Sequence, residues 1–222
     1  MDRLTFQAID DYMQATMKDS AHDYLHIYRV LGQALNIAEH YPEINRDVLI
    51  AACLLHDIGR VLEDENPDLC HAVEGGKQAY AFLRDLGCQE SLCVHVQDCI
   101  TTHRYRTDRT PVTLEAQILF DADKLDAARA LGIARTLNYG GKLGEPLYTA
   151  DENHQIFDGS EEDAPQSFLR EYHFKLNRVY ERFYTPEAEA IAAKRRASAT
   201  QFYHDLLHEA KIGEIDIETI LT

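Results

Sequence analysis

Apolar residues recur at helical spacing along nearly the whole chain, and no stretch shows the strict alternation of a β-strand. The pattern predicts an N-terminal helix and then helices over residues 22–40, 46–56, 72–86, 89–103, 113–138, 167–184 and 185–210. Start and stop signals support these bounds: Ser20 can cap the second helix, Pro42 ends it, and Pro186 opens the last one. We therefore expect an all-α fold with a single domain.

Two polar stretches interrupt the helical pattern. Residues 63–68 are rich in Asp, Glu, Asn and Pro, and residues 142–164 are polar and contain glycine and proline. We interpret both as loops. A loop as long as the second is often functional or mobile in a compact domain.

Composition and charge exclude several classes of function. A chain of 222 residues can bury one sizeable core, and its net charge of −16 argues against coating a nucleic-acid polymer. A local cationic pocket can still bind a small phosphate compound. No apolar run is long enough for a signal core or a membrane span. The five cysteines form no Cys-x-x-Cys pair, which favours reduced thiols and a cytoplasmic protein.

The chemistry centres on a histidine–aspartate pair at the end of an apolar run. Residues 48–55 are apolar, and His56 and Asp57 follow directly. His26 lies upstream on a predicted helix, and Asp123 lies downstream in an apolar helical context. Imidazole and carboxylate together suit Mn, Fe, Co, Ni and Zn. Because His56 and Asp57 are adjacent, both reach one ion only where the helix end distorts, and Gly59 is placed to permit that distortion.

Other interpretations of these residues exist. A second histidine–aspartate pair occurs at His22, and His22 and His26 have the i, i+4 spacing that can hold zinc. That pair lacks the glutamate of a His-Glu-x-x-His protease, so we favour the ordered set of four. Asp121, Asp123 and Asp126 could also form a solvated acidic face.

The ordered set, with its flanking motifs, resembles the HD superfamily of metal-dependent phosphohydrolases. The matching elements are His22-Asp23-x-x-His26, Ala52-x-Leu54-Leu55-His56-Asp57-Ile58-Gly59, His71-Ala72-x-Glu74-Gly75-Gly76, Ile100-x-x-His103-Arg104, Asp121 to Ala127, Gly132-Ile133-Ala134-Arg135, and His173-Phe174 with Asn177. They cover most of residues 20–210. In this family the last ligand is the aspartate of an Ala-Asp-(Lys/Arg)-Leu element, which selects Asp123 over Asp121. Arg129 departs from the small residue expected there and puts local packing or substrate choice in doubt.

The resemblance implies an HD-domain helical bundle. Its parts are an N-terminal helix (1–20), a metal-binding core (21–140), and a loop with C-terminal helices packed on the core (141–222). It also implies hydrolysis of a phosphate ester or anhydride, with a nucleotide as the expected substrate. One divalent ion (Mn, Co, Ni, Fe or Zn) is expected on four ligands: His26, His56, Asp57 and Asp123.

Further residues are expected to act on the substrate. Besides Asp57, the catalytic candidates are Lys124, Glu74, His71 and His103. The phosphate-binding candidates are Arg29, Arg104, Arg106 and Arg135. We expect His71 and His103 to contact phosphate or transfer protons, because a second ion needs a bridging ligand and arginines follow His103.

Partners and alternative functions complete these expectations. We expect a small phosphate compound as partner, with no nucleic-acid polymer and no membrane, and leave a homodimer open. The alternatives are a non-catalytic metal- or nucleotide-binding sensor module and, with less support, a di-iron oxygenase that uses the extra histidines.

Overall fold

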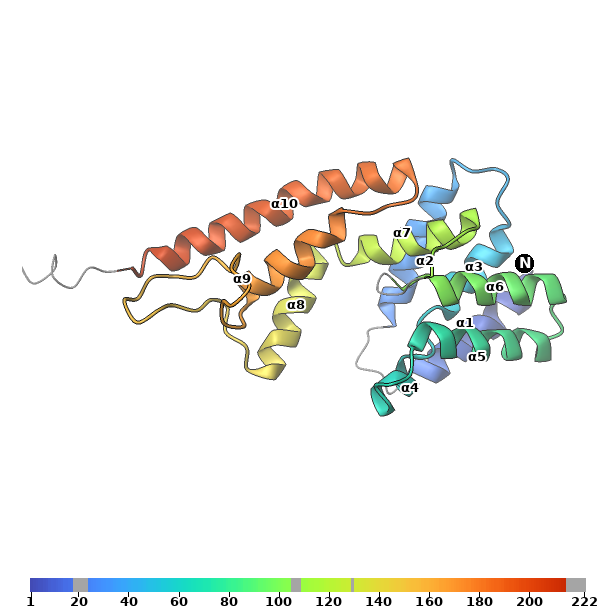
Figure 1. The fold of residues 1–222 in the computed structure, drawn as a ribbon. Coiled ribbons are helices and arrows are strands. Elements are labelled where there is room, and N and C mark those ends of the chain that lie inside the picture. The colour runs from blue at the N-terminus through green and yellow to red at the C-terminus, as the bar shows by residue number, and fades with distance from the viewer. Residues whose placement is uncertain (18–23, 105–108, 129, 215–222) are drawn as a thin grey trace, which may run out of the picture. The chain divides into compact units, whose positions relative to one another are not determined.

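The structure, a computed structural model, describes residues 1–17, 24–104, 109–128 and 130–214 (Figure 1). The chain divides into two compact units, of which the first comprises Met1–Asp126 and Phe183–Ala188. The second comprises Ala127–Arg182 and the chain from Glu189 onward. In the described ranges the regular structure is helical, apart from an isolated bridge between Ala150 and Ile156. The expected all-α fold is confirmed.

In its described residues, the first unit is a bundle of seven helices built around α3. The helices are α1 (Arg3–Met17), α2 (Leu25–Ala38), α3 (Arg46–Leu55), α4 (Arg60–Glu65), α5 (His71–Asp85), α6 (Glu90–Thr102) and α7 (Leu114–Asp126). Helix α3 starts at Asn45, whose side chain accepts hydrogen bonds from the amides of Asp47 and Val48. From Val48 onward it is apolar, and it contacts α1, α2, α5, α6 and α7. Each fully buried leucine on it contributes about 1.5–3 kcal/mol, so the end of α3 is firmly placed.

Gly59 brings α4 close to the beginning of α5. A Cβ atom on Gly59 would lie 2.2 Å from the carbonyl oxygen of His71 and 2.6 Å from the amide nitrogen of Gly75. Gly59 itself has ordinary right-handed backbone angles (φ −77°, ψ −5°). We expected the glycine to permit distortion of the helix end. That expectation stays a prediction, while the close contact with the start of α5 requires a glycine here because any side chain would collide with it.

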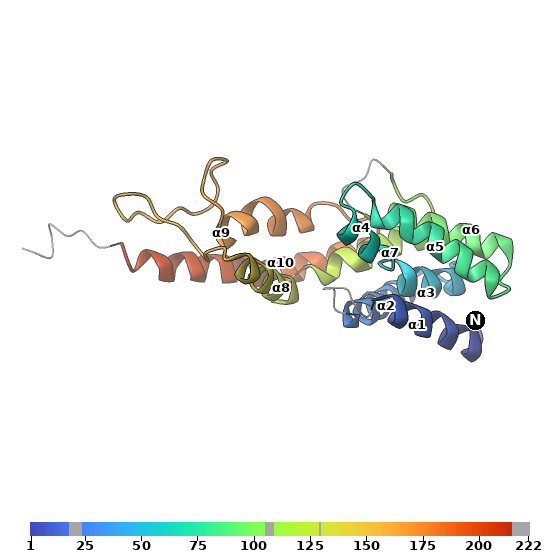
Figure 2. The ribbon, with the colours of Figure 1, turned by 90° about the horizontal axis from the view of Figure 1, so that it is seen from below.

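The second unit contains α8 (Ala130–Leu143), the short helix α9 (Phe168–Glu171) and most of α10 (Pro186–Lys211). Its core is formed by Ile133, Phe168, Leu169, Tyr172, Ala199 and Tyr203. The segment that contains α9 runs alongside α10 in both views (Figures 1 and 2). The first residues of α10 belong to the first unit.

Three predicted elements differ from the structure. Residues 60–65 form α4, although the polar stretch from residue 63 suggested a loop. The predicted helix over 113–138 is two helices, α7 and α8, and a Cβ atom on Gly132 would lie 1.8 Å from the carbonyl oxygen of Ala127. The predicted helix over 167–184 is α9 followed by a π-helical turn and a 3-10 turn that ends at Tyr180.

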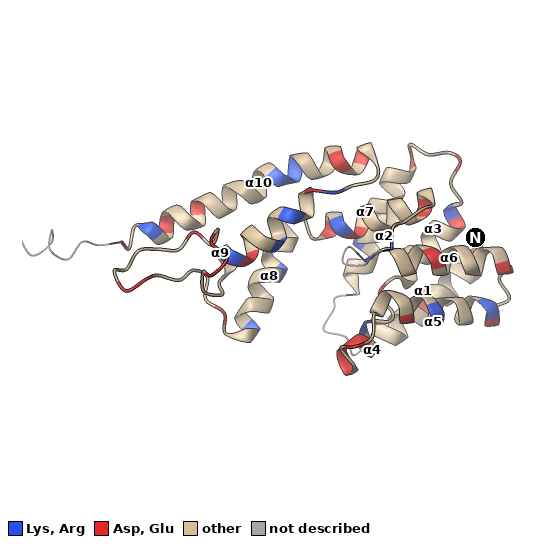
Figure 3. Ribbon diagram, viewed as in Figure 1, with Lys and Arg blue, Asp and Glu red and all other residues tan. Residues whose placement is uncertain are grey.

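Some expectations are not decided by the fold. The boundaries expected at residues 20 and 140 stay predictions, while the compact units divide after Asp126. Ser20, His22 and Arg129 lie outside the described residues. Among the helices that the structure describes, none has the length and apolar character needed to cross a membrane. Acidic residues occur in both units, including α4 and the loop after α8 (Figure 3).

Candidate metal centre

Four buried histidines of the first unit meet at the ends of its helices. They are His26 near the start of α2, His56 after α3, His71 at the start of α5 and His103 after α6. The Nδ1 atom of each ring has an oxygen acceptor: Asp126 Oδ2 for His26 (2.7 Å), the Cys53 carbonyl for His56 (2.8 Å), Glu63 Oε2 for His71 (2.6 Å) and the Ile100 carbonyl for His103 (2.6 Å). A neutral ring that donates from Nδ1 keeps its Nε2 lone pair for another partner. All four rings therefore present Nε2 to the site.

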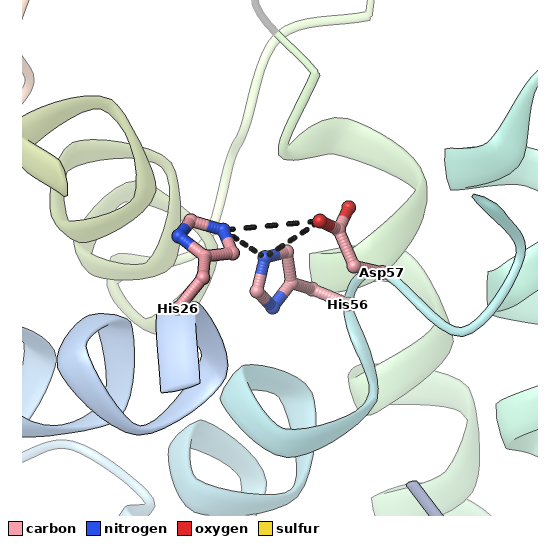
Figure 4. A group of neighbouring side chains, drawn as sticks. All are labelled: His26, His56 and Asp57. Carbon is pink, nitrogen blue, oxygen red and sulfur yellow. Dashed lines mark hydrogen bonds and ion pairs between the residues drawn. The ribbon is translucent and has the colours of Figure 1, made fainter. Parts of the chain in front are cut away.

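The first group of ligand atoms contains the four residues predicted to bind metal. The Nε2 atoms of His26 and His56 are 3.4 Å apart (Figure 4). Asp57 Oδ2 lies 3.8 and 3.7 Å from these two nitrogens. Asp123 Oδ1 lies 3.1 Å from His26 Nε2 and 3.8 Å from His56 Nε2. The structure brings these four residues together, and their role as metal ligands stays a prediction.

The second group lies on the other side of the Asp57 carboxylate. Asp57 Oδ1 is 3.5 Å from His71 Nε2 and 3.7 Å from His103 Nε2, and the two nitrogens are 3.4 Å apart. His103 also joins His56 and Asp123 in a further possible ligand set. Asp57 thus presents one oxygen to each group. This arrangement supplies the bridging carboxylate that the sequence did not reveal.

These donors fit a divalent cation. Two ligands at about 2.0–2.2 Å from one ion lie roughly 3.0–3.7 Å apart, close to the separations in the first group. Asp57 Oδ2 is buried and has no hydrogen-bond partner among the described residues, although a buried carboxylate oxygen normally has one. A carboxylate oxygen and several imidazole lone pairs that face one another repel unless a cation or a proton lies between them. The centre can therefore hold a metal ion.

Burial and neighbouring charges alter the pKa values of these side chains. Burial disfavours the charged ring of His26, but hydrogen bonds to Asp123 and Asp126 outweigh it and raise the pKa of His26 to about 9. Burial lowers the pKa of His56 and of His71 to about 4. Burial also opposes the ionisation of Asp123, yet the contact with His26 lowers the pKa of this carboxyl group. Neutral histidines and ionised carboxylates are the forms that bind metal, so an ion at this centre would displace the second ring proton of His26.

Three carboxylates around the centre also bind arginines. Asp126 accepts hydrogen bonds from Arg29 Nε (2.7 Å) and Nη2 (3.1 Å). Asp57 Oδ1 accepts one from Arg60 Nε (2.9 Å), and Glu63 Oε1 accepts one from Arg104 Nη1 (2.7 Å). These arginines hold the anionic side chains of the site in place.

The remaining candidates are placed in different ways. The Glu74 carboxylate forms an ion pair with Lys77 Nζ at 2.7 Å. The Lys124 ammonium lies over the rings of Phe120 and Phe183, at 5.6 and 4.9 Å from their centroids. Arg135 is on α8 in the second unit, and Arg106 lies outside the described residues. The substrate roles expected for these residues stay predictions.

Asp121 has a different partner from Asp123. Its carboxylate accepts hydrogen bonds from the amides of Tyr184 and Thr185 and from the Thr185 hydroxyl. This contact supports the choice of Asp123 as the ligand. Sequence reasoning missed Arg60 and Glu63, whose only signal was their i, i+3 spacing directly after the His-Asp turn.

The chain is similar to several known proteins. It matches the HD domain family over residues 23–128. YpgQ of Bacillus subtilis is 29% identical over 219 residues, which cover 96% of each protein. A crystal structure of YpgQ in complex with ADP is 26% identical with a TM-score of 0.68, covering 93% of this chain and 95% of that one.

Two further relatives differ in how much of their length is matched. The crystal structure of an HD-superfamily hydrolase from Bacillus thuringiensis is 26% identical with a TM-score of 0.70, covering 93% of this chain and 97% of that one. The 3'-5' exoribonuclease YhaM of Listeria innocua is 26% identical over 117 residues, which cover 46% of this chain and 37% of that protein.

Proposed function

Since this chain belongs to the HD superfamily, with its HD domain at residues 23–128, we propose that it is a metal-dependent phosphohydrolase that cleaves a phosphoanhydride or phosphoester bond of a nucleotide. One observation carries the proposal. Four imidazole Nε2 atoms and the carboxylates of Asp57 and Asp123 converge, and Asp57 Oδ2 has no hydrogen-bond partner in the part of the chain that the structure describes.

His26, His56, Asp57 and Asp123 would hold the ion, with Mn, Co, Ni, Fe and Zn all compatible with this donor set. Such an ion, when bound, polarises a phosphoryl oxygen and lowers the pKa of a water molecule that it coordinates. The protein orients its own groups for this task, since Asp126 fixes the His26 ring and the Cys53 carbonyl fixes the His56 ring.

The geometry of His71 and His103 favours some of their expected roles over others. In the tautomer set by Glu63 and the Ile100 carbonyl, their Nε2 atoms accept rather than donate hydrogen bonds. They therefore suit proton transfer or a second cation better than a direct contact with phosphate, which needs a donor. We propose that His71 and His103 transfer protons and that a single ion binds in the first group. The number of metal ions per chain distinguishes this arrangement from a binuclear centre.

Arg104 is the cation that we assign to the substrate phosphate. Its side chain is 26% exposed, and it follows His103 directly in the chain. Guanidinium groups bind phosphate through paired hydrogen bonds. YpgQ, which has been crystallised with ADP, supports a nucleotide as the substrate class.

The test is a panel of nucleoside mono-, di- and triphosphates incubated with the Mn²⁺-loaded protein, with the products resolved by chromatography. A single-stranded RNA oligomer is a second arm because of the similarity to YhaM, and His56→Ala is the matched inactive variant. We expect nucleotides to be cleaved, RNA to stay intact and the variant to be inactive. If neither nucleotides nor a generic phosphoester is cleaved with Mn²⁺, Co²⁺ or Ni²⁺, the protein is a non-catalytic binding module.

A further inference from the structure

Glu63 links two candidate groups of the site through its two oxygens. Its Oε2 accepts a hydrogen bond from His71 Nδ1 at 2.6 Å, and its Oε1 accepts one from Arg104 Nη1 at 2.7 Å. Both bonds are short, as expected when a carboxylate is the acceptor. Through this one side chain α4 is tied to the start of α5 and to the end of α6.

The bond to Glu63 determines which nitrogen of His71 carries the proton. His71 is buried, and its Nε2 faces His103 Nε2 at 3.4 Å and Asp57 Oδ1 at 3.5 Å. A carboxylate on Nδ1 keeps the proton on that atom, which leaves the Nε2 lone pair directed at the centre. Without this acceptor, the proton would be drawn to Nε2, where Asp57 Oδ1 can accept it.

The same carboxylate restrains the arginine that we assign to substrate phosphate. Arg104 Nη1 lies 2.7 Å from Glu63 Oε1 and 3.5 Å from Cys70 Sγ. A phosphate that binds this guanidinium competes with Glu63 for it. Glu63 is 18% exposed, so it lies between the buried ring and the more exposed guanidinium.

An arrangement of the same kind occurs at the first ligand group. Asp126 accepts hydrogen bonds from His26 Nδ1 and from Arg29. In both places a carboxylate joins the Nδ1 atom of a site histidine to an arginine. The repetition in separate helices indicates that the links serve the site and are not incidental surface ion pairs, which contribute little.

We propose that Glu63 is a positioning residue that fixes the tautomer of His71 and restrains Arg104 at the same time. The part that concerns Arg104 rests on the proposed function. Two consequences follow for Glu63→Gln. The value of kcat falls by about 10–100-fold, the usual effect of losing such a supporting carboxylate. KM for the nucleotide does not rise, because the guanidinium loses a competing anion.

The direct test is ¹⁵N NMR of the histidine rings in the metal-free, full-length protein at neutral pH. In the wild type, we expect His71 as a single tautomer protonated at Nδ1. In Glu63→Gln the amide is a weaker acceptor and can also donate to His71 Nδ1, so we expect a mixture of tautomers or a shift to Nε2–H. The matched control is Glu65→Gln, which removes the same charge from an exposed position on the same helix and leaves the His71 signals unchanged.

A second variant separates the two links. Arg104→Ala keeps Glu63 on His71, so we expect the wild-type His71 tautomer together with a raised KM. The proposal is overturned if the His71 signals of Glu63→Gln match those of the wild type, or if Arg104→Ala changes them as much as Glu63→Gln does. The NMR measurements need no turnover, so an inactive wild-type protein would refute the proposed function and leave this inference to be decided by the spectra.

Discussion

Asp121 and Asp123 lie two residues apart on α7, and their contacts predict that mutation of Asp121 lowers stability whereas mutation of Asp123 abolishes metal binding. Asp121→Ala removes the acceptor of the Tyr184 amide (3.0 Å), the Thr185 amide (2.8 Å) and the Thr185 hydroxyl (2.7 Å). The hydroxyl can rotate to another acceptor, but the two amides cannot. A buried donor without a partner costs about 1–3 kcal/mol, so two such amides lower the free energy of unfolding by roughly 2–6 kcal/mol.

Because Asp121 is a buried carboxylate, we expect the loss of stability in Asp121→Ala to lie near the lower end of that range. Burial raises the pKa of Asp121 against the opposing effect of its hydrogen bonds to Thr185, so the ionised carboxylate itself carries a desolvation cost that alanine removes. We therefore expect a loss of about 2–3 kcal/mol. At about 2–4 °C per kcal/mol for a chain of this length, the Tm falls by roughly 4–12 °C.

The assay combines thermal unfolding followed by circular dichroism with metal analysis after dialysis. Asp121→Ala should lower the Tm and retain bound metal, whereas Asp123→Ala should lose the metal because it removes a ligand. The reasoning is refuted if Asp121→Ala loses its metal at an unchanged Tm, since Asp121 would then act at the ion and not at the start of α10.

Three further predictions concern the site. Asp126→Asn should weaken Mn²⁺ binding by about 10–100-fold in isothermal titration, because Asp126 holds Nδ1 of His26; an unchanged Kd would show that the ring is oriented by other contacts. His103→Ala should reduce turnover and leave the metal content unchanged, whereas loss of metal would reveal a binuclear centre and favour oxygenase chemistry. A chelator should abolish turnover, and Mn²⁺ should restore it; activity that persists in metal-free protein would exclude the proposed mechanism.

The helical pattern of the sequence was sufficient to predict the fold class. The four candidate ligands came from the ordered histidine and aspartate motifs and from their resemblance to the HD superfamily. His56 and Asp57 follow an apolar run, and Asp123 lies in a second apolar helical segment, so packing of the apolar helix faces can bring them together. His71 and His103 were expected to contact phosphate or transfer protons, which requires a place near the ligands, and the structure places both beside Asp57.

Other features of the site depend on contacts between residues that are distant in the sequence, and local spacing does not predict such contacts. The bridging position of Asp57 arises because Gly59 brings α5 within contact distance. Glu63 resembled a loop residue because its neighbours are polar, and its role becomes visible only when Arg104, distant in sequence, lies beside it. The aromatic rings next to Lys124 come partly from Phe183, far along the chain, so its environment could not be predicted locally.

The most direct test of the metal centre is elemental analysis of the wild type, His56→Ala and Asp123→Ala after Mn²⁺ loading and desalting. The geometry of the first ligand group predicts about one ion per chain in the wild type and none in either variant. Retention of the wild-type metal content in both variants would contradict the assignment of these residues as ligands.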